Sequence, residues 1–277
     1  MIDRRINAFR PDLADSALAG IVTAPRYADG VYHRCTWPGV TIHADPDGQS
    51  TAVSSLLLGE TFIAFDVVGG WAWGQCLHDR YVGWIEAAAL VPHGDLPATH
   101  WVIAPLAPVF AAPDIKAHVM LVLPMMARLV ADGIHGRFVA AASGFVHDRH
   151  LAPLTVHRSD PAAVALSLVG APYVWGGRSA LGLDCSGLTQ TALRACGVFC
   201  PRDSDQQAAT FAAIDPSDRR RGDLVTFPGH VGILADADTL IHANAHWMST
   251  VAEPLADVAA RLAPTAFHRP PQVVASC

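Results

Sequence analysis

The sequence predicts an α+β protein in which two small β-barrels precede a domain of helices and antiparallel strands. From residue 37 to about residue 153, short apolar runs alternate with Gly, Pro and Asp turn signals, a pattern typical of β structure. Within this region Gly83-Trp84-Ile85 recurs 61 residues later as Gly144-Phe145-Val146. Two copies of one β unit indicate two barrels, because propellers and solenoids need more repeats. After Ser159, helix signals come before further strands, which is the α+β order.

These changes divide the chain into four segments. Residues 1–36 lack clear periodicity and are expected to form a lead-in segment. Residues 37–95 form the first predicted barrel and residues 96–157 the second, since a closed barrel hides the edges of its strands. Residues 158–277 form the α+β domain. In the first barrel we expect strands at 53–58, 61–68, 71–76 and 81–85.

The start of the last segment carries the signals of two helices. Asp160 suits an N-cap, Pro161 the first turn and Gly170 the end of a helix over 162–169. A second helix is expected over 186–196, because Leu188, Ala192 and Cys196 share one face and Gly197 follows. Four strands should come next, at residues 223–227, 230–234, 239–242 and 247–251.

Composition excludes several classes of protein. Nineteen basic against 25 acidic residues give a net charge of −6, and no basic run exceeds residues 219–221, so nucleic acid is not an expected partner. The most apolar stretch, 117–130, is broken by polar residues and shorter than the roughly 18 residues of a membrane span. Six scattered cysteines and an N-terminus without an apolar signal core predict reduced thiols and a cytoplasmic location. No metal or other cofactor is expected, because Cys196-x3-Cys200 has no second pair at ligand spacing.

Cys185 is the candidate nucleophile. It follows Asp184 at the start of the second expected helix, where the helix dipole should lower the thiol pKa and favour the reactive thiolate. A thiol nucleophile needs a base and a group that orients the base. His230 and His242 lie on neighbouring expected strands, so the two rings can meet on one face. Spacing alone leaves open whether they form a triad with Cys185 or are two surface histidines.

Six short blocks follow one another in this region: APYVWGG at 171–177, GLDCSGL at 182–188, PRDS at 201–204, RGDLV at 221–225, GHVGI at 229–233 and IHA at 241–243. Together they resemble the NlpC-type cell-wall cysteine peptidases. The resemblance runs from about residue 159 to the C-terminus, and it implies a papain-like domain that hydrolyses peptidoglycan stem peptides at the bond from the D-glutamyl γ-carbonyl to the diamino acid. Two alternatives remain: a thiol acyltransferase or amidase on a similar Cys–His domain, and a non-catalytic wall-binding protein.

The resemblance implies a role for each catalytic residue. Cys185 attacks the carbonyl, His230 takes and returns the proton, and His242 orients His230. The backbone N–H of Cys185 and the Tyr173 hydroxyl would hold the oxyanion, although a tyrosine in this position could also be a core aromatic.

Both barrels resemble bacterial SH3-like domains. In the first barrel, Glu60 within LLGE and Tyr81 within YVGW match motifs that lend a carboxylate and a phenol to the active site of family members acting on free stem peptides. The alternative for Glu60 is a solvated turn carboxylate. The second barrel has no comparable polar motif, so it is expected to be a spacer.

The expected substrate is a free stem peptide, L-Ala-γ-D-Glu-diamino acid, with an unblocked N-terminus. Asp184 and Glu60 would pair with its ammonium, and two carboxylates there favour a recycling enzyme over one that cuts intact wall. Arg202 and Ser204 would hold the α-carboxylate of D-glutamate, because the guanidinium fork matches a carboxylate. Ser186 and Trp175 complete the expected substrate contacts, with Trp175 open to a core role instead. The sequence does not specify the oligomeric state.

Overall fold

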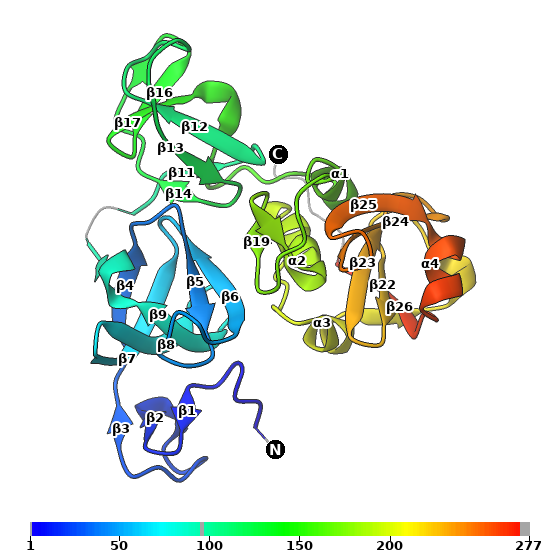
Figure 1. Ribbon diagram of the computed structural model, residues 1–277, viewed down its shortest axis with the longest axis horizontal. Helices are drawn as coiled ribbons and strands as arrows, with labels where there is room; N and C mark the ends of the chain where they lie inside the picture. The colour runs from blue at the N-terminus through cyan, green and yellow to red at the C-terminus, as the bar shows by residue number, and fades with distance from the viewer. Residues whose placement is uncertain (1, 95–96, 272–277) are drawn as a thin grey trace. The chain divides into compact units, whose positions relative to one another are not determined.

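The computed structural model describes residues 2–94 and 97–271, and its contacts divide the chain into two compact units (Figure 1). Unit 1 comprises Met1–Trp101, Pro108–Leu123 and Ala127–Asp148. Unit 2 comprises Val102–Ala107, Pro124–Met126 and Arg149–Cys277. The expected α+β architecture is confirmed, since unit 1 is built from strands and unit 2 holds the α-helices beside a sheet.

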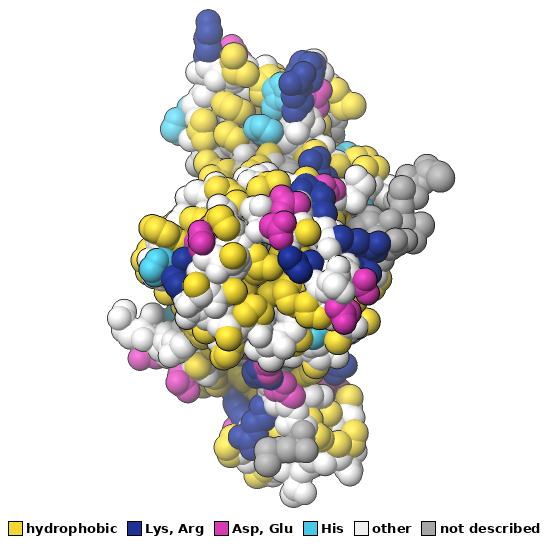
Figure 2. Space-filling model, turned by 90° about the vertical axis from the view of Figure 1, so that its right-hand side faces the viewer, with side chains coloured by type: hydrophobic (Ala, Val, Ile, Leu, Met, Phe, Trp, Pro, Cys, Tyr) yellow, Lys and Arg dark blue, Asp and Glu magenta, His cyan; other side chains and the backbone are white. Residues whose placement is uncertain are grey.

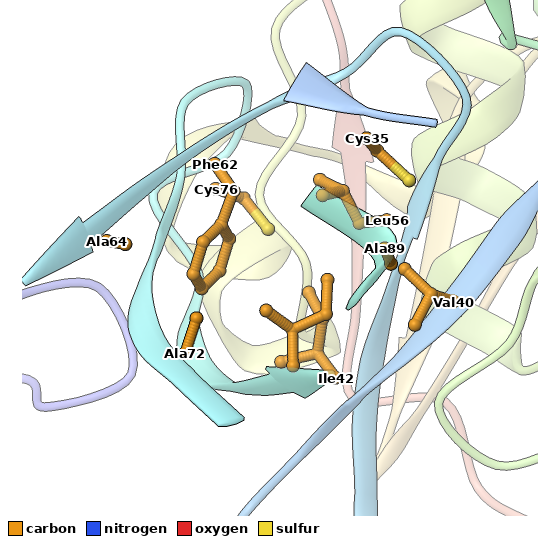
Figure 3. Packing of buried hydrophobic residues seen from close by; sticks show 10 residues of the cluster. Cys35, Val40, Ile42, Leu56, Phe62, Ala64, Ala72, Cys76 and Ala89 are labelled. Carbon is orange, nitrogen blue, oxygen red and sulfur yellow. The ribbon is translucent and has the colours of Figure 1, made fainter. Parts of the chain in front are cut away.

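The first barrel is a seven-stranded sheet in the order β10-β4-β7-β8-β9-β5-β6. Its alternating inward side chains form one apolar core that includes Val40, Leu56, Phe62 and Cys76 (Figure 3). The strands at 61–68 and 71–76 begin and end where the sequence predicts. The strands are β4 (Val31–Cys35), β5 (Gly39–His43), β6 (Ala52–Leu57), β7 (Thr61–Val68), β8 (Trp71–Cys76), β9 (Val82–Glu86) and β10 (Leu90–Pro92).

The expectation of a lead-in segment over 1–36 is wrong. Strand β4 pairs with β7 and β10, so the barrel begins before residue 37. The preceding residues form a small sheet of β1 (Phe9–Arg10), β2 (Leu13–Asp15) and β3 (Tyr27–Ala28). Leu13 packs with Trp73, and the Arg10 guanidinium lies 4.8 Å from the centroid of the same ring. Strands of two or three residues are too short to show a period, which is why the sequence did not reveal them.

The 61-residue repeat corresponds to a repeated run of elements. In the first copy, β9 leads into a short 3-10 helix at Ala87–Ala89 and then β10. In the second copy, β17 (Gly144–His147) leads into a 3-10 helix at Asp148–His150 and then β18 (Leu151–Pro153). The other strands of the second copy are β11 (His100–Val102), β12 (Leu106–Phe110), β13 (Val119–Pro124), β14 (Arg128–Leu129), β15 (Ile134–His135) and β16 (Phe138–Ala141). The sequence repeat therefore marks a genuine repeat of local structure.

Unit 2 centres on a six-stranded sheet in the order β21-β26-β22-β23-β24-β25. Its neighbouring strands are antiparallel, as the sequence predicts. Helix α2 (Cys185–Ala195) packs on β23 and β24, and α4 (Leu255–Arg261) packs on β24 and β25 (Figure 1). The strands are β21 (Ala212–Ile214), β22 (Leu224–Phe227), β23 (His230–Leu234), β24 (Thr239–Asn244), β25 (Ser249–Pro254) and β26 (Ala266–Arg269), with a two-stranded ribbon of β19 (Arg178–Ser179) and β20 (Gly182–Leu183).

Capping residues determine where the helices begin. The Asp160 carboxylate accepts the backbone N–H of Ala162 and Ala163, which starts α1 at Pro161 as expected, although α1 (Pro161–Leu166) ends earlier than residue 169. The Asp184 carboxylate likewise accepts the N–H of Gly187 and starts α2. Helix α3 (Ser204–Thr210) and α4 are too short for their periodicity to predict them.

Two properties of the surface are relevant to partners. On the face that Figure 2 shows, basic and acidic side chains lie next to each other rather than in separate fields. Among the helices of the described residues, none has the length and apolar character needed to cross a membrane.

Candidate active site

Cys185 is the first residue of α2, and its side chain is almost completely buried. Burial and the negative charge of Asp184 raise the pKa of the Cys185 thiol to about 11. Backbone hydrogen bonds from Val231 and Ser186, together with Arg202, act in the opposite direction but do not offset burial. The expected lowering of this pKa is therefore wrong for the resting protein, because burial outweighs the contribution of the helix start. The hydrogen bond to Val231 also brings the sulfur next to the start of β23, where His230 lies.

The structure brings the two predicted histidines together. His230 Nε2 lies 2.8 Å from His242 Nδ1, and the ring centroids are 5.0 Å apart. The register of β23 and β24 pairs Leu234 with Leu240, and side chains alternate along a strand, so both histidines point to the same side of the sheet. Two independent surface histidines are excluded, because His242 is only 2% exposed and holds the ring of His230.

Burial keeps both rings neutral at pH 7. Desolvation, with a smaller contribution from His242, lowers the pKa of His230 to about 4. Desolvation also lowers the pKa of His242, against the opposing effect of Glu253. Since His230 Nε2 is bonded to His242, only Nδ1 of His230 remains to accept a proton. The resting site thus combines a neutral thiol with a neutral imidazole, and the proton moves when the sulfur attacks.

Glu253 of β25 is a site residue that the sequence analysis missed. Its Oε1 lies 2.7 Å from His242 Nε2 and 2.6 Å from Arg261 Nη2. Hydrogen bonds from these two residues lower the pKa of Glu253, so it is ionised at neutral pH. The sequence predicts the end of this strand at residue 251, whereas β25 continues to Pro254 and so includes Glu253.

Tyr173 lies half-buried in the segment before β19. Burial, followed by the nearby charges of Cys185 and Asp184, raises the pKa of its hydroxyl to about 12. The hydroxyl therefore keeps its proton at neutral pH and can donate a hydrogen bond. This electrostatic coupling to Cys185 fits the predicted role at the oxyanion, which stays a prediction.

The structure contradicts the expectation that Arg202 is available for a substrate carboxylate. Its guanidinium forms a two-pronged ion pair with Asp184, at 2.9 Å to Oδ1 and 2.6 Å to Oδ2, and also donates to Ser186 Oγ. Arg202 is only 1% exposed. Asp184 Oδ2 also accepts the N–H of Gly176 at 2.8 Å. The charge of Asp184, expected to face a substrate ammonium, is thus balanced by Arg202, and Ser186 belongs to the same buried network.

Trp175 and Ser204 have the exposure that substrate contacts require. Trp175 is 62% exposed, so the alternative that it fills the core is wrong. Ser204 is half-buried at the first position of α3, directly after the capping residue Asp203. Their roles in binding remain predictions.

Glu60 and Tyr81 lie in unit 1. Glu60 is 1% exposed, and its Oε2 accepts the backbone N–H of Leu57 at 3.0 Å, so the alternative of a solvated turn carboxylate is wrong. Its Oε1 lies 3.6 Å from His78 Nδ1. Tyr81 is 6% exposed, and its backbone N–H donates to Asp79 Oδ1. Their expected contact with a substrate stays a prediction.

One group of described residues could hold a metal ion, although none is expected from the sequence. Cys76, His78 and Asp79 place one potential ligand atom each within 4.8 Å of one another. Thiolate, imidazole and carboxylate together are ligands typical of zinc. His78 already pairs with Asp79 at 3.1 Å in the structure. The group belongs to the first barrel and not to the Cys185 network of unit 2.

Comparisons with known families agree with this arrangement. Residues 170–257 match the NlpC/P60 family, and residues 42–90 match the bacterial dipeptidyl-peptidase SH3 domain. A gamma-D-glutamyl-L-lysine dipeptidyl-peptidase of Bacillus subtilis is 27% identical over 140 residues, which cover 47% of each chain. Dipeptidyl-peptidase 6 of Lysinibacillus sphaericus is 38% identical over 88 residues, 31% of this chain and 32% of that protein. The chain thus matches less than half the length of these relatives.

A solved structure supports the fold over most of the chain. The crystal structure of an NlpC/P60 family protein from Bacillus cereus aligns with 88% of this chain and all of its own, with a TM-score of 0.76 at 19% identity. At that identity the likeness concerns the fold alone. The family matches show an NlpC/P60 domain over residues 170–257, which contains Cys185, His230 and His242, and a bacterial dipeptidyl-peptidase SH3 domain over residues 42–90.

Proposed function

We propose that the protein is a cysteine endopeptidase that cleaves free peptidoglycan stem peptides between D-glutamate and the diamino acid, leaving the unblocked L-Ala on the released dipeptide. The observation that carries the proposal is the hydrogen-bonded histidine pair beside the Cys185 thiol. A relic domain that only binds the wall would have no reason to keep thiol, base and orienting group assembled.

The proposed reaction has two steps in which Cys185 and His230 act together. The Cys185 sulfur attacks the γ-carbonyl of D-glutamate while its proton passes to Nδ1 of His230. His230 then protonates the leaving amine of the diamino acid, and water releases the acyl group. Because resting thiol and imidazole are both neutral, charge develops only during attack, and the Cys185 N–H and the Tyr173 hydroxyl are suited to receive it.

Two lines support the choice of substrate. The Bacillus subtilis relative is a gamma-D-glutamyl-L-lysine dipeptidyl-peptidase by name, and the matched SH3 domain is of the dipeptidyl-peptidase type. Glu60 supplies a buried carboxylate in that SH3 domain. A carboxylate that faces the N-terminus of the substrate favours a free ammonium over a neutral amide, because it attracts the positive charge of the ammonium. A peptide with a free N-terminal L-Ala meets this requirement, whereas one attached to the lactyl group of muramic acid does not.

Mass spectrometry of products from L-Ala-γ-D-Glu-diaminopimelate tests the proposal. Release of L-Ala-D-Glu by the wild type, and not by Cys185→Ala, is the expected result. Transfer of the dipeptide to an added amine instead of water would favour the acyltransferase. If the same peptide is supplied attached to muramic acid, cleavage only at the muramoyl bond would favour the amidase. No product from any of these substrates would favour a binding protein. Equal rates on free tripeptide and intact sacculi would overturn the recycling role.

An enzyme that recycles wall peptides must be in the compartment into which the wall fragments are imported. We therefore propose a cytoplasmic location, which cell fractionation with an antibody to the protein tests directly. Enrichment in the wall or medium fraction would contradict it.

A further inference from the structure

The geometry points to Glu253 as a positioning residue that fixes which nitrogen of His230 is free to act as the base. This inference rests on the proposed peptidase function. Two hydrogen bonds connect the Glu253 carboxylate to the His230 ring, which accepts the thiol proton. Glu253 Oε1 lies 2.7 Å from His242 Nε2, and His242 Nδ1 lies 2.8 Å from His230 Nε2.

The contacts of His242 and His230 require particular hydrogen positions. An ionised carboxylate only accepts hydrogen bonds, so His242 Nε2 must carry a proton towards Glu253. A neutral His242 then has a lone pair at Nδ1, and His230 must donate to it from Nε2. The remaining nitrogen of His230, Nδ1, is therefore unprotonated. That is the form of His230 which can take a proton from Cys185.

A second neighbour of His242 favours the opposite arrangement. Asn244 Oδ1 accepts the backbone N–H of Trp247 at 2.9 Å, which fixes the orientation of the amide. Its Nδ2 consequently faces His242 Nε2 at 3.1 Å, and a donor there is satisfied by a lone pair. If His242 Nε2 were unprotonated, the single ring proton of His242 would be on Nδ1. His230 Nε2 would then accept that hydrogen bond, and the ring proton of His230 would be on its Nδ1. In that form His230 cannot act as the base.

Glu253 and Asn244 thus compete for a hydrogen bond with His242 Nε2. The bond to Glu253 leaves His230 Nδ1 free to act as the base, whereas the bond to Asn244 does not. Glu253 is closer, is charged, and is itself held by Arg261 Nη2 at 2.6 Å and Trp247 Nε1 at 3.3 Å. Charge-assisted hydrogen bonds are about twice as strong as neutral ones, so the carboxylate prevails. No proton is gained or lost between the two arrangements, since each ring keeps one proton and only its position changes.

The test reads the tautomer directly. Long-range ¹H–¹⁵N correlation spectra of histidine-labelled protein at pH 7 should show His230 and His242 protonated at Nε2 in the wild type. In Glu253→Ala both rings should shift towards protonation at Nδ1, and kcat should fall about 10- to 100-fold with little change in KM, less than the ~10⁴-fold loss when a direct partner of a catalytic histidine sets the wrong tautomer. Glu253→Gln keeps an acceptor oxygen, so it should retain the wild-type tautomer and more activity than Glu253→Ala.

Two further variants separate positioning from folding. Adding Asn244→Leu to Glu253→Ala removes the competing donor and should restore part of the Nε2 tautomer and of kcat. Glu86→Ala removes an exposed glutamate in the first barrel and should change neither. An unchanged His230 tautomer in folded Glu253→Ala would overturn the inference, whatever the substrate. If the wild type cleaves no stem peptide, the proposed function fails, but the spectra still decide the role of Glu253.

Discussion

The buried ion pair between Asp184 and Arg202 decides between two roles for Arg202. Replacing Arg202 by methionine keeps a long apolar side chain but removes the guanidinium, which donates to both oxygens of Asp184. The carboxylate would keep the backbone N–H groups of Gly176 and Gly187 but would lose its positive partner. The two side chains are 1% and 8% exposed, so water cannot replace that partner without a rearrangement.

The expected cost of Arg202→Met is large relative to the stability of a domain. Removing one member of a buried ion pair costs about 3–5 kcal/mol, and native proteins are stable by only about 5–15 kcal/mol. The same change should raise the pKa of Cys185 further, because Arg202 lowers it and Asp184 raises it. Asp184→Asn combined with Arg202→Met removes both charges and keeps a residue able to cap α2, so the double variant should be more stable than Arg202→Met alone.

Urea unfolding followed by tryptophan fluorescence, together with KM for the free tripeptide, provides the measurements. We expect a lower unfolding midpoint for Arg202→Met and partial recovery in the double variant. A midpoint equal to that of the wild type, with a raised KM alone, would refute the structural role and return Arg202 to the substrate carboxylate.

Three other outcomes follow from burial and charge. Cys185 should react with iodoacetamide before Cys196, because it is more exposed and burial raises its pKa to about 11 against about 12 for Cys196; peptide mapping that finds Cys196 modified first would contradict this. In the folded protein the pKa of His230 is about 4, below its ordinary 6.5, so between these pH values the unfolded chain binds one more proton than the folded chain. The free energy of unfolding should therefore fall by up to about 3 kcal/mol as the pH drops through this window. His230→Gln should flatten that dependence in urea titrations at pH 7 and pH 4.5. Glu60→Gln should lose rate on free tripeptide without gaining rate on the sugar-linked peptide, and a gain there would argue against a role in selecting the ammonium.

Local signals in the sequence predicted the framework of the site well. Asp184 accepts the N–H of Gly187 and starts α2, and Gly197 follows the end of the helix with a φ of 77°, which favours glycine. The strand over 230–234 has the predicted bounds. These features depend on residues that are neighbours in the chain, so a single sequence contains the information needed to place Cys185 and His230.

Features that depend on distant neighbours could not be predicted in the same way. Arg202 lies 18 residues from Asp184, and only the packing of α3 against α2 brings its guanidinium to the carboxylate. Glu253 reaches His242 because β25 pairs with β24 along six residues, which is longer than the sequence pattern indicated. In both cases the residue type was visible in the sequence, but the partner that determines its role was not.

The helix start and burial have opposite effects on the pKa of Cys185, and their magnitudes decide which one prevails. A helix N-terminus stabilises a nearby negative charge by about 0.3–1 kcal/mol, which is less than one pKa unit. Full burial can shift a pKa by about 3–5 units, and the Cys185 side chain is only 7% exposed. Burial therefore prevails at rest, and a buried His230 with a pKa of about 4 is a weak acceptor for the thiol proton. The same burial strengthens the hydrogen bonds that hold His230, His242 and Glu253 in line. Cys185 and His230 consequently stay neutral until a substrate carbonyl is present for the sulfur to attack.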